Sequence, residues 1–127
     1  MGGDPMTTIL IVDDDPEIQR IFTTFLNIMG YSTLSAAGGE ECLTLLKKHH
    51  PDLILLDILM EPMDGWQTLT MIKTHPEMVD VPVLVVTGKK IDTDELKKHH
   101  DKFKLYLMKP VTARQLKDAI EMYIKSP

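Results

Sequence analysis

The chain of 127 residues is 43% hydrophobic and 26% charged, a composition typical of one globular domain with a single core. Its formal net charge is −5 and its lysines and arginines are scattered, which argues against direct binding to nucleic acid. A single cysteine excludes an internal disulfide and is consistent with a reducing compartment.

The N-terminus is not expected to carry a targeting signal. Residues 1–5 have neither the basic start nor the apolar centre of a signal peptide, and no apolar run is long enough to span a membrane. We therefore expect a cytoplasmic protein without membrane contact. Residues 1–6 are expected to form a flexible leader, 7–125 the folded domain and 126–127 a tail.

Strands and helices are predicted to alternate along the chain. Five apolar or β-prone stretches predict strands: Thr7–Val12, Tyr31–Ala36, Leu53–Leu56, Val83–Val86 and Leu105–Met108. Five helices are predicted to follow them, starting at Pro16, after Gly39, near Trp66, at Asp92 and after Thr112. This alternation predicts an α/β fold of the doubly wound, flavodoxin-like (βα)5 type, with a five-stranded parallel sheet in the order 2-1-3-4-5.

Residues typical of helix ends mark several of these boundaries. Asp15 followed by Pro16 is typical of a helix start, and Gly30 is expected to end that first helix. Two later helices start with pairs that have the spacing of a capping box: Asp64 with Gln67, and Thr112 with Gln115. The mostly polar helix from Asp92 to His99 is expected to be the least well packed element.

The stretch Leu53–Leu56 is apolar without a break and runs directly into Asp57. Such a run is typical of a strand buried on both faces. By itself it leaves two interpretations of Asp57 open: a residue that ends the strand and starts a turn, and a reactive carboxylate at the rim of the sheet. The ends of the other strands decide between them.

Reactive or charged side chains follow four of the five predicted strands. They are Asp13 and Asp14 after the first, Asp57 after the third, Thr87 after the fourth and Lys109 after the fifth. In the order 2-1-3-4-5 these four strands are neighbours, so the side chains converge on one rim. In doubly wound folds that rim, at the carboxyl ends of the strands, binds ligands.

These groups predict a site for Mg²⁺ and a phosphoryl group. The carboxylates of Asp13, Asp14 and Asp57 repel one another unless a cation lies among them, and oxygen ligands without histidine or cysteine favour Mg²⁺. Lys109 and the metal would offset the charge of a phosphoryl group, and Thr87 would hydrogen-bond one of its oxygens. Asp57 would be the nucleophile.

With these positions in place, the chain resembles the response-regulator receiver domain, the CheY-like module of two-component signalling. The resemblance extends from about residue 7 to 124 and rests on the motifs Ile-Val-Asp-Asp-Asp-Pro, Leu-Leu-Asp-Ile-Leu-Met, Met-Asp-Gly, Val-Val-Thr-Gly and Met-Lys-Pro. The roles that it implies are Asp57 as phosphoacceptor; Asp13, Asp14, Asp57 and the Leu59 backbone carbonyl as metal ligands; Thr87, Gly88 and Lys109 as phosphate contacts; and Thr87 with Tyr106 as the switch pair. It also implies a cis peptide bond between Lys109 and Pro110.

The chain departs from the family pattern at three places. Pro62 is displaced by one position, so the loop after the phosphoacceptor is expected to bend differently, and Glu61 adds a carboxylate there. Gly88 stands where alanine is common and leaves its loop freer. The usual Gly-Ala before the last strand is replaced by residues 100–103. None of these departures removes a reactive group.

The resemblance implies a phosphoacceptor signalling domain rather than an enzyme. With Mg²⁺ as cofactor, Asp57 would take a phosphoryl group from a phosphohistidine of a sensor histidine kinase or phosphotransfer protein. The added charge would draw Thr87 inward, let Tyr106 swing into the vacated space and change the face of the fourth helix, fifth strand and fifth helix. Output would pass to a downstream partner protein or an output domain. Autodephosphorylation is expected to be slow, because an apolar Leu59 cannot orient the attacking water.

Other classes of protein fit the sequence less well. A phosphohydrolase of the haloacid dehalogenase type places its nucleophile in Asp-x-Asp after the first strand, and a flavodoxin-like cofactor binder needs a Ser/Thr/Gly loop there. This chain has three aspartates, 13–15, at that place. An NTPase would need the upstream half of a P-loop. The remaining alternative is a degenerate receiver that docks partners without phosphorylation.

Several polar and aromatic residues are assigned to structure. Asp15 and Asp52 are interpreted as cap and turn residues. The histidine pairs at 49–50 and 99–100 are interpreted as solvated helix ends rather than a metal site, because adjacent residues on a helix do not face each other. Trp66 and Phe103 are interpreted as packing residues, with a docking face as the alternative.

Overall fold

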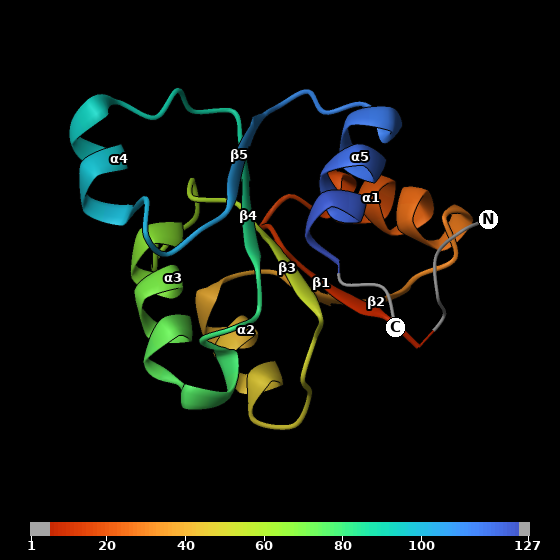
Figure 1. The fold of residues 1–127 in the computed structure, drawn as a ribbon, viewed down its shortest axis with the longest axis horizontal. Coiled ribbons are helices and arrows are strands. Elements are labelled where there is room, and N and C mark those ends of the chain that lie inside the picture. The colour runs from red at the N-terminus through yellow and green to blue at the C-terminus, as the bar shows by residue number, and fades with distance from the viewer. Residues whose placement is uncertain (1–5, 125–127) are drawn as a thin grey trace.

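The computed structural model describes residues 6–124 and shows a parallel sheet with helices on both faces (Figure 1). The strands are β1 (Thr8–Val12), β2 (Ser32–Ala36), β3 (Leu53–Leu56), β4 (Val83–Thr87) and β5 (Leu105–Met108). Their order in the sheet is β2-β1-β3-β4-β5, which confirms the predicted fold class. The predicted tail, 126–127, and residues 1–5 of the predicted leader lie outside the described residues.

The helices fall where the sequence predicts them. They are α1 (Pro16–Ile28), α2 (Gly39–Leu46), α3 (Gly65–Thr74), α4 (Thr93–His99) and α5 (Ala113–Tyr123). One short element, the 3₁₀ helix η1 (Pro76–Met78), lies between α3 and β4 and was not predicted. It forms because Pro76 suits a first helical position and Met78 is buried, at 1% exposure, under the end of α3.

Alternate residues of the central strands pack into two separate hydrophobic cores, one on each face of the sheet. Ile9 and Ile11 of β1 pack on one face of the sheet, in the cluster that contains Leu26 of α1 and Ile120 of α5. On the opposite face, Leu10 and Val12 pack in a cluster with α2, α3 and η1, whose members include Cys42, Leu69, Ile72 and Met78. Because β3 is buried on both faces, Asp57 at its end is held on a rigid support.

Three predicted cap positions are confirmed. The Asp15 carboxylate accepts a hydrogen bond from the Glu17 N–H at 2.9 Å and caps α1. Capping boxes open α3 and α5: Asp64 with Gln67, and Thr112 with Gln115. Gly30, just beyond α1, has a φ of 99°, in the left-handed region that glycine adopts without strain.

Helix α4 is the least buried helix, as expected. None of its residues is buried, and it lies apart from the two main cores at the upper left of Figure 1. A third, smaller cluster lies beneath this region and contains Ile58, Val85 and Ile91, with Trp66 and other aromatic residues packed against it. The same region contains a further capping box, Asp92 with Glu95, which has the sequence spacing of such a box but was not predicted.

Two proline loops have cis peptide bonds. The Lys109–Pro110 bond is cis, as the resemblance implies. The Glu61–Pro62 bond is also cis. That the displaced Pro62 bends the loop after Asp57 differently from other members of the family stays a prediction.

Candidate functional site

The carboxyl ends of β1, β3, β4 and β5 meet at one rim of the sheet. Backbone pairing continues one residue past the strands, since the Asp57 N–H donates to the Val12 carbonyl at 3.0 Å. On the other side, the Lys109 N–H donates to the Thr87 carbonyl at 2.8 Å. These bonds fix the main chain at Asp57, Thr87 and Lys109.

Three carboxylates gather at this rim. Asp13, Asp14 and Asp57 each offer a ligand oxygen, and these oxygens lie within 4.8 Å of one another. Asp13 and Asp57 are buried, at 3% and 5% exposure, whereas Asp14 is exposed. The arrangement combines two immobile buried carboxylates with one that reaches solvent, and hard oxygen donors of this kind suit Mg²⁺.

Lys109 lies against the two buried carboxylates. Its ammonium nitrogen Nζ is 2.7 Å from Asp13 Oδ2 and 3.2 Å from Asp57 Oδ2. Burial disfavours the charged ammonium, but the hydrogen bond to Asp13 and the charges of both aspartates together raise the pKa of Lys109 above its ordinary value. The lysine is therefore a permanent cation at neutral pH.

Burial dominates the titration of Asp13. It raises the pKa of that carboxyl above its ordinary value, although the hydrogen bonds from Lys109 and from the Asp15 N–H oppose the effect. The Asp57 charge adds to the increase. The folded chain therefore holds the ionised Asp13 at a cost, which a divalent cation would relieve.

The second oxygen of each buried carboxylate is fixed by the backbone. Asp57 Oδ1 accepts the Leu59 N–H at 2.9 Å, and Asp13 Oδ1 accepts the Asp15 N–H at 2.9 Å. Both side chains are thus oriented before any ligand arrives. By contrast, the Asp14 carboxylate makes no hydrogen bond within the part of the chain that the structure describes.

Gln19 was not predicted to belong to this region. Its side-chain Nε2 donates to the carbonyl of Asp13 at 2.9 Å and to that of Ala36 at 2.8 Å. It therefore ties the ends of β1 and β2 together beneath the acidic group. No local sequence signal marks this role, because a glutamine in the first turns of a helix is usually solvated.

Gly65 is required by a close approach of backbones. A Cβ atom at this position would collide with the carbonyl oxygen of Asp57 and the Cα of Ile58. Gly65 also donates its N–H to the Ile58 carbonyl at 3.1 Å. The start of α3 thus packs directly on the main chain of the predicted phosphoacceptor, which explains the glycine of the Met-Asp-Gly motif.

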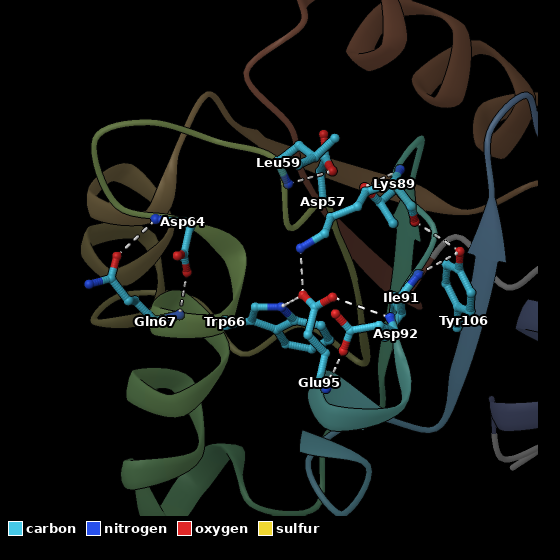
Figure 2. A network of polar contacts seen from close by, with 11 residues as sticks. Asp57, Leu59, Asp64, Trp66, Gln67, Lys89, Ile91, Asp92, Glu95 and Tyr106 are labelled. Atoms are coloured by element: carbon cyan, nitrogen blue, oxygen red, sulfur yellow. Dashed lines mark hydrogen bonds and ion pairs between the residues drawn. The ribbon is translucent and has the colours of Figure 1, made fainter. Parts of the chain in front are cut away.

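Thr87 and Tyr106 both contact Lys89. Thr87 is fully buried, and its hydroxyl accepts the Lys89 N–H at 3.2 Å. The Tyr106 hydroxyl donates to the Lys89 carbonyl at 2.8 Å and accepts the Ile91 N–H at 3.3 Å (Figure 2). The half-buried Tyr106 side chain is therefore directed at the loop between β4 and α4.

Leu59 and Gly88 lie at the open side of the site. The Leu59 side chain is 52% exposed, and a Cβ atom added at Gly88 would meet nothing within 4 Å. The side-chain positions of both residues thus face open space rather than the core. The proposed roles of their backbone groups stay predictions.

The interpretation of His99 as a solvated helix end is wrong. Its ring stacks on that of Trp66, with centroids 4.2 Å apart and an angle of 5° between the planes. Phe103 also contacts Trp66, with ring centroids 5.9 Å apart and an angle of 42° between the planes. The stacking arises because α4 has few apolar residues, so the imidazole at its last turn covers the tryptophan. Asp52 has the structural role expected, accepting the Thr8 N–H at 2.8 Å.

The family model for the response regulator receiver domain matches residues 9–121. The chain belongs to the response-regulator receiver family. It is therefore a receiver domain of two-component signalling, with a CheY-like fold. Receiver domains interact with histidine kinases or phosphotransfer proteins and are signalling domains rather than classical enzymes. None of the described helices is long and apolar enough to cross a membrane.

Relatives of this receiver come from several organisms. The N-terminal domain of a response regulator receiver protein from Methanoculleus marisnigri JR1 is 47% identical, with a TM-score of 0.77, and the match covers 94% of this chain and 98% of that one. Polar-differentiation response regulator DivK of Brucella ovis is 29% identical over 117 residues, 92% of this chain and 95% of its own.

A longer relative matches only in part. The probable transcriptional regulator ycf27 of Porphyridium aerugineum is 32% identical over 117 residues, which are 92% of this chain and 48% of that protein. The chain thus spans about half the length of this relative. The match to the receiver family does not depend on the function of the other half of that relative.

Proposed function

We propose that Asp57 accepts a phosphoryl group from a phosphohistidine of a sensor histidine kinase or phosphotransfer protein, in a Mg²⁺-dependent reaction. The observation that carries this proposal is the joint contact of Lys109 with Asp13 and Asp57 beside the exposed Asp14. A nucleophilic carboxylate, a cation and a pair of further acids are the groups that phosphoryl transfer to aspartate requires.

The acidic residues fit the metal. Asp13, Asp14 and Asp57, with the Leu59 backbone carbonyl, would hold Mg²⁺, because the carboxylate oxygens of the three aspartates are already gathered and the ion prefers oxygen donors. When bound, the ion supplies positive charge that stabilises the phosphoryl oxygens in the transition state.

Residues of the chain itself supply the nucleophile, the positive charge and the hydrogen bonds for the transfer. A carboxylate oxygen of Asp57 attacks phosphorus in line, the new O–P bond forms, and the N–P bond to the donor imidazole breaks with its electron pair left on the imidazole. Lys109 offsets charge on the phosphoryl oxygens. The Thr87 hydroxyl and the backbone at Gly88 hydrogen-bond them.

The switch follows from the competition for Thr87. Once its hydroxyl turns toward a phosphoryl oxygen, it can no longer accept the Lys89 N–H, and Tyr106 moves into the space that Thr87 vacates. This would change the face formed by α4, β5 and α5, which a downstream partner protein or an output domain reads. We place this signalling in the cytoplasm, without direct contact to nucleic acid or membrane.

Intact-mass measurement tests the proposal. The protein is incubated with acetyl phosphate in the presence of Mg²⁺ or EDTA, beside the variants Asp57→Asn and Asp15→Asn. Asp15→Asn is the matched control, because asparagine caps a helix as well as aspartate does and the residue lies outside the acidic group. Gain of one phosphoryl group with Mg²⁺, lost only in Asp57→Asn, supports the proposal. No gain in the wild-type protein would favour the alternative, a degenerate receiver that docks partners without phosphorylation.

A further inference from the structure

Lys89 uses all of its polar groups to join separate parts of the molecule. Its N–H donates to the Thr87 hydroxyl, and its carbonyl accepts the Tyr106 hydroxyl. Its ammonium forms an ion pair with Glu95 of α4, with Nζ 2.6 Å from Oε2 (Figure 2). One residue thus contacts both members of the switch pair through its backbone and α4 through its side chain.

Glu95 passes the connection on to α3. The carboxylate oxygen that binds Lys89, Oε2, also accepts the indole N–H of Trp66 at 2.8 Å. The other oxygen accepts the Asp92 N–H at 3.3 Å within the capping box of α4. The hydrogen bond from Lys89 and, next, that from Trp66 lower the pKa of Glu95 to about 2, so its carboxylate stays ionised at neutral pH.

Trp66 holds α4 at both ends. It lies in the first turn of α3, where its indole N–H meets Glu95 near the start of α4 and its ring stacks on His99 at the end of α4. Since no residue of α4 is buried, these contacts and the cluster around Ile91 are what position the helix. Trp66 and His99 also line a surface groove of about 640 Å³ beside Met63 and Met71.

We propose that Lys89 couples the phosphoacceptor pocket to the packing of α4 against α3, through Glu95 and Trp66. The inference rests on the proposed phosphorylation of Asp57 as its trigger. When the Thr87 hydroxyl turns to the phosphoryl group, Lys89 loses the acceptor of its N–H and its main chain moves. The ion pair with Glu95 then transmits that movement to Trp66 and the groove. Lys89 and Glu95 are positioning residues in this account, and the α3–α4 groove is a second surface that reports the state of the pocket.

A purely local ion pair would behave differently. An exposed lysine–glutamate pair stabilises its own helix and has no reason to respond to a threonine in a neighbouring pocket. Here the same residue that pairs with Glu95 is bound by Thr87, and the same glutamate oxygen binds the tryptophan. The bonds form one continuous chain, so a change at its first member reaches its last.

The single tryptophan of the sequence makes the test direct, because ¹⁵N-labelled protein gives one indole N–H signal in the NMR spectrum. The signal is recorded before and after phosphorylation with acetyl phosphate and Mg²⁺, at phosphoryl occupancy measured by intact mass. Lys89→Met removes the ammonium and leaves the Glu95–Trp66 bond intact. Lys90→Met, at the exposed neighbouring lysine, is the matched control. Glu95→Gln, which keeps the capping geometry, breaks the chain at its next bond.

A second comparison needs no phosphoryl group. Thr87→Val removes the hydroxyl that accepts the Lys89 N–H, and the displacement of the indole signal that it causes is compared in the wild-type and Lys89→Met backgrounds. We expect phosphorylation and Thr87→Val each to move the signal in the wild-type background. Both effects should be largely lost with Lys89→Met or Glu95→Gln and kept with Lys90→Met.

The outcomes separate this inference from the proposed function. If the phosphorylated wild-type protein shows no displacement, or Lys89→Met keeps all of it at equal occupancy, the coupling is refuted while the phosphoacceptor role stands. If the wild-type protein gains no phosphoryl mass, the proposed function fails, and the Thr87→Val comparison alone decides the coupling. Displacement through Lys89 then supports it, and absence of displacement overturns it.

Discussion

Gly65 and Gly88, which lie next to the main chain of Asp57 and directly after Thr87, have opposite steric surroundings. A Cβ atom at Gly65 would collide with the main chain of Asp57 and Ile58, whereas one at Gly88 would meet open space. Backbone atoms cannot move aside as a flexible side chain can. The fold therefore requires glycine at position 65 but not at position 88.

Gly65→Ala is expected to lower the free energy of unfolding by about 1–3 kcal/mol, the usual cost of forcing an extra group into a packed site. Gly88→Ala should change it by no more than about 0.5 kcal/mol. Urea denaturation of the two variants checks this difference. Equal stability of the two would mean that α3 can shift away from β3 at no cost, contrary to the packing observed.

Leu59 bears on how long the phosphoryl group would stay on Asp57. Its side chain is half exposed at the open side of the pocket and has no group that could orient water. Leu59→Asn should speed the decay of the phosphorylated protein by about tenfold, which corresponds to about 1.4 kcal/mol of activation free energy. Loss of phosphoryl mass over time measures this rate, and Leu59→Val should decay as the wild-type protein does. An unchanged rate in Leu59→Asn would show that Leu59 does not limit water attack.

At the scale of elements, α4 differs from the other helices in what holds it. Helices α1, α2, α3 and α5 bury apolar residues in the two main cores, while α4 buries none and depends on Glu95, Trp66 and His99. A helix held by polar contacts responds to charge and pH more than one held by apolar packing. The element at the proposed output face is thus the one most easily moved.

The Glu95 contacts should be visible in the pH dependence of stability. A carboxyl whose pKa is lowered by folding, here from 4.5 to about 2, stabilises the fold fully above the unfolded value and loses this effect as pH falls through the folded value. Glu95→Gln should therefore cost about 1 kcal/mol at pH 7, in the range of a partly exposed ion pair, and progressively less from about pH 4.5 toward pH 2. Urea denaturation over this range measures it. Asp94→Asn is the control, and a pH-independent cost for Glu95→Gln would contradict the assignment.

At the scale of the whole molecule, the acidic rim links stability to metal binding. Burial raises the pKa of Asp13, so the ionised carboxyl destabilises the fold once pH exceeds the unfolded value of 3.8, and this cost is complete above the folded pKa. A ligand that binds only the folded chain adds stability, about 2.7 kcal/mol at a concentration of 100 times its Kd.

Asp13→Asn should therefore raise the melting temperature at pH 7 without metal, and should lose most of the increase that Mg²⁺ gives to the wild-type protein. Thermal unfolding with and without MgCl₂ measures both effects, with Asp15→Asn as control. An equal Mg²⁺-induced increase in the two proteins would place the ion away from Asp13.

Much of the fold could be predicted because its signals are local. Residues a few positions apart determine the ends of strands β3 and β5, the caps at Asp15 and Asp64, and the poor burial of α4. The short helix η1 was missed because a 3₁₀ turn of three residues has too little periodicity to be read. Glu95 could have been identified as a capping residue from its spacing to Asp92, but not as a partner of Lys89 and Trp66.

The sequence by itself determined which side chains follow each strand. It therefore also determined that acids, a hydroxyl and a lysine meet at one rim of the sheet. Parallel strands bring their carboxyl ends together whatever their detailed packing. Only the tertiary structure decided which atoms touch. Lys109 bonds Asp13 across 96 positions of sequence, and His99 stacks on Trp66 instead of facing solvent. Such contacts depend on how whole elements pack and on which rotamer each side chain adopts, and no local pattern carries that information.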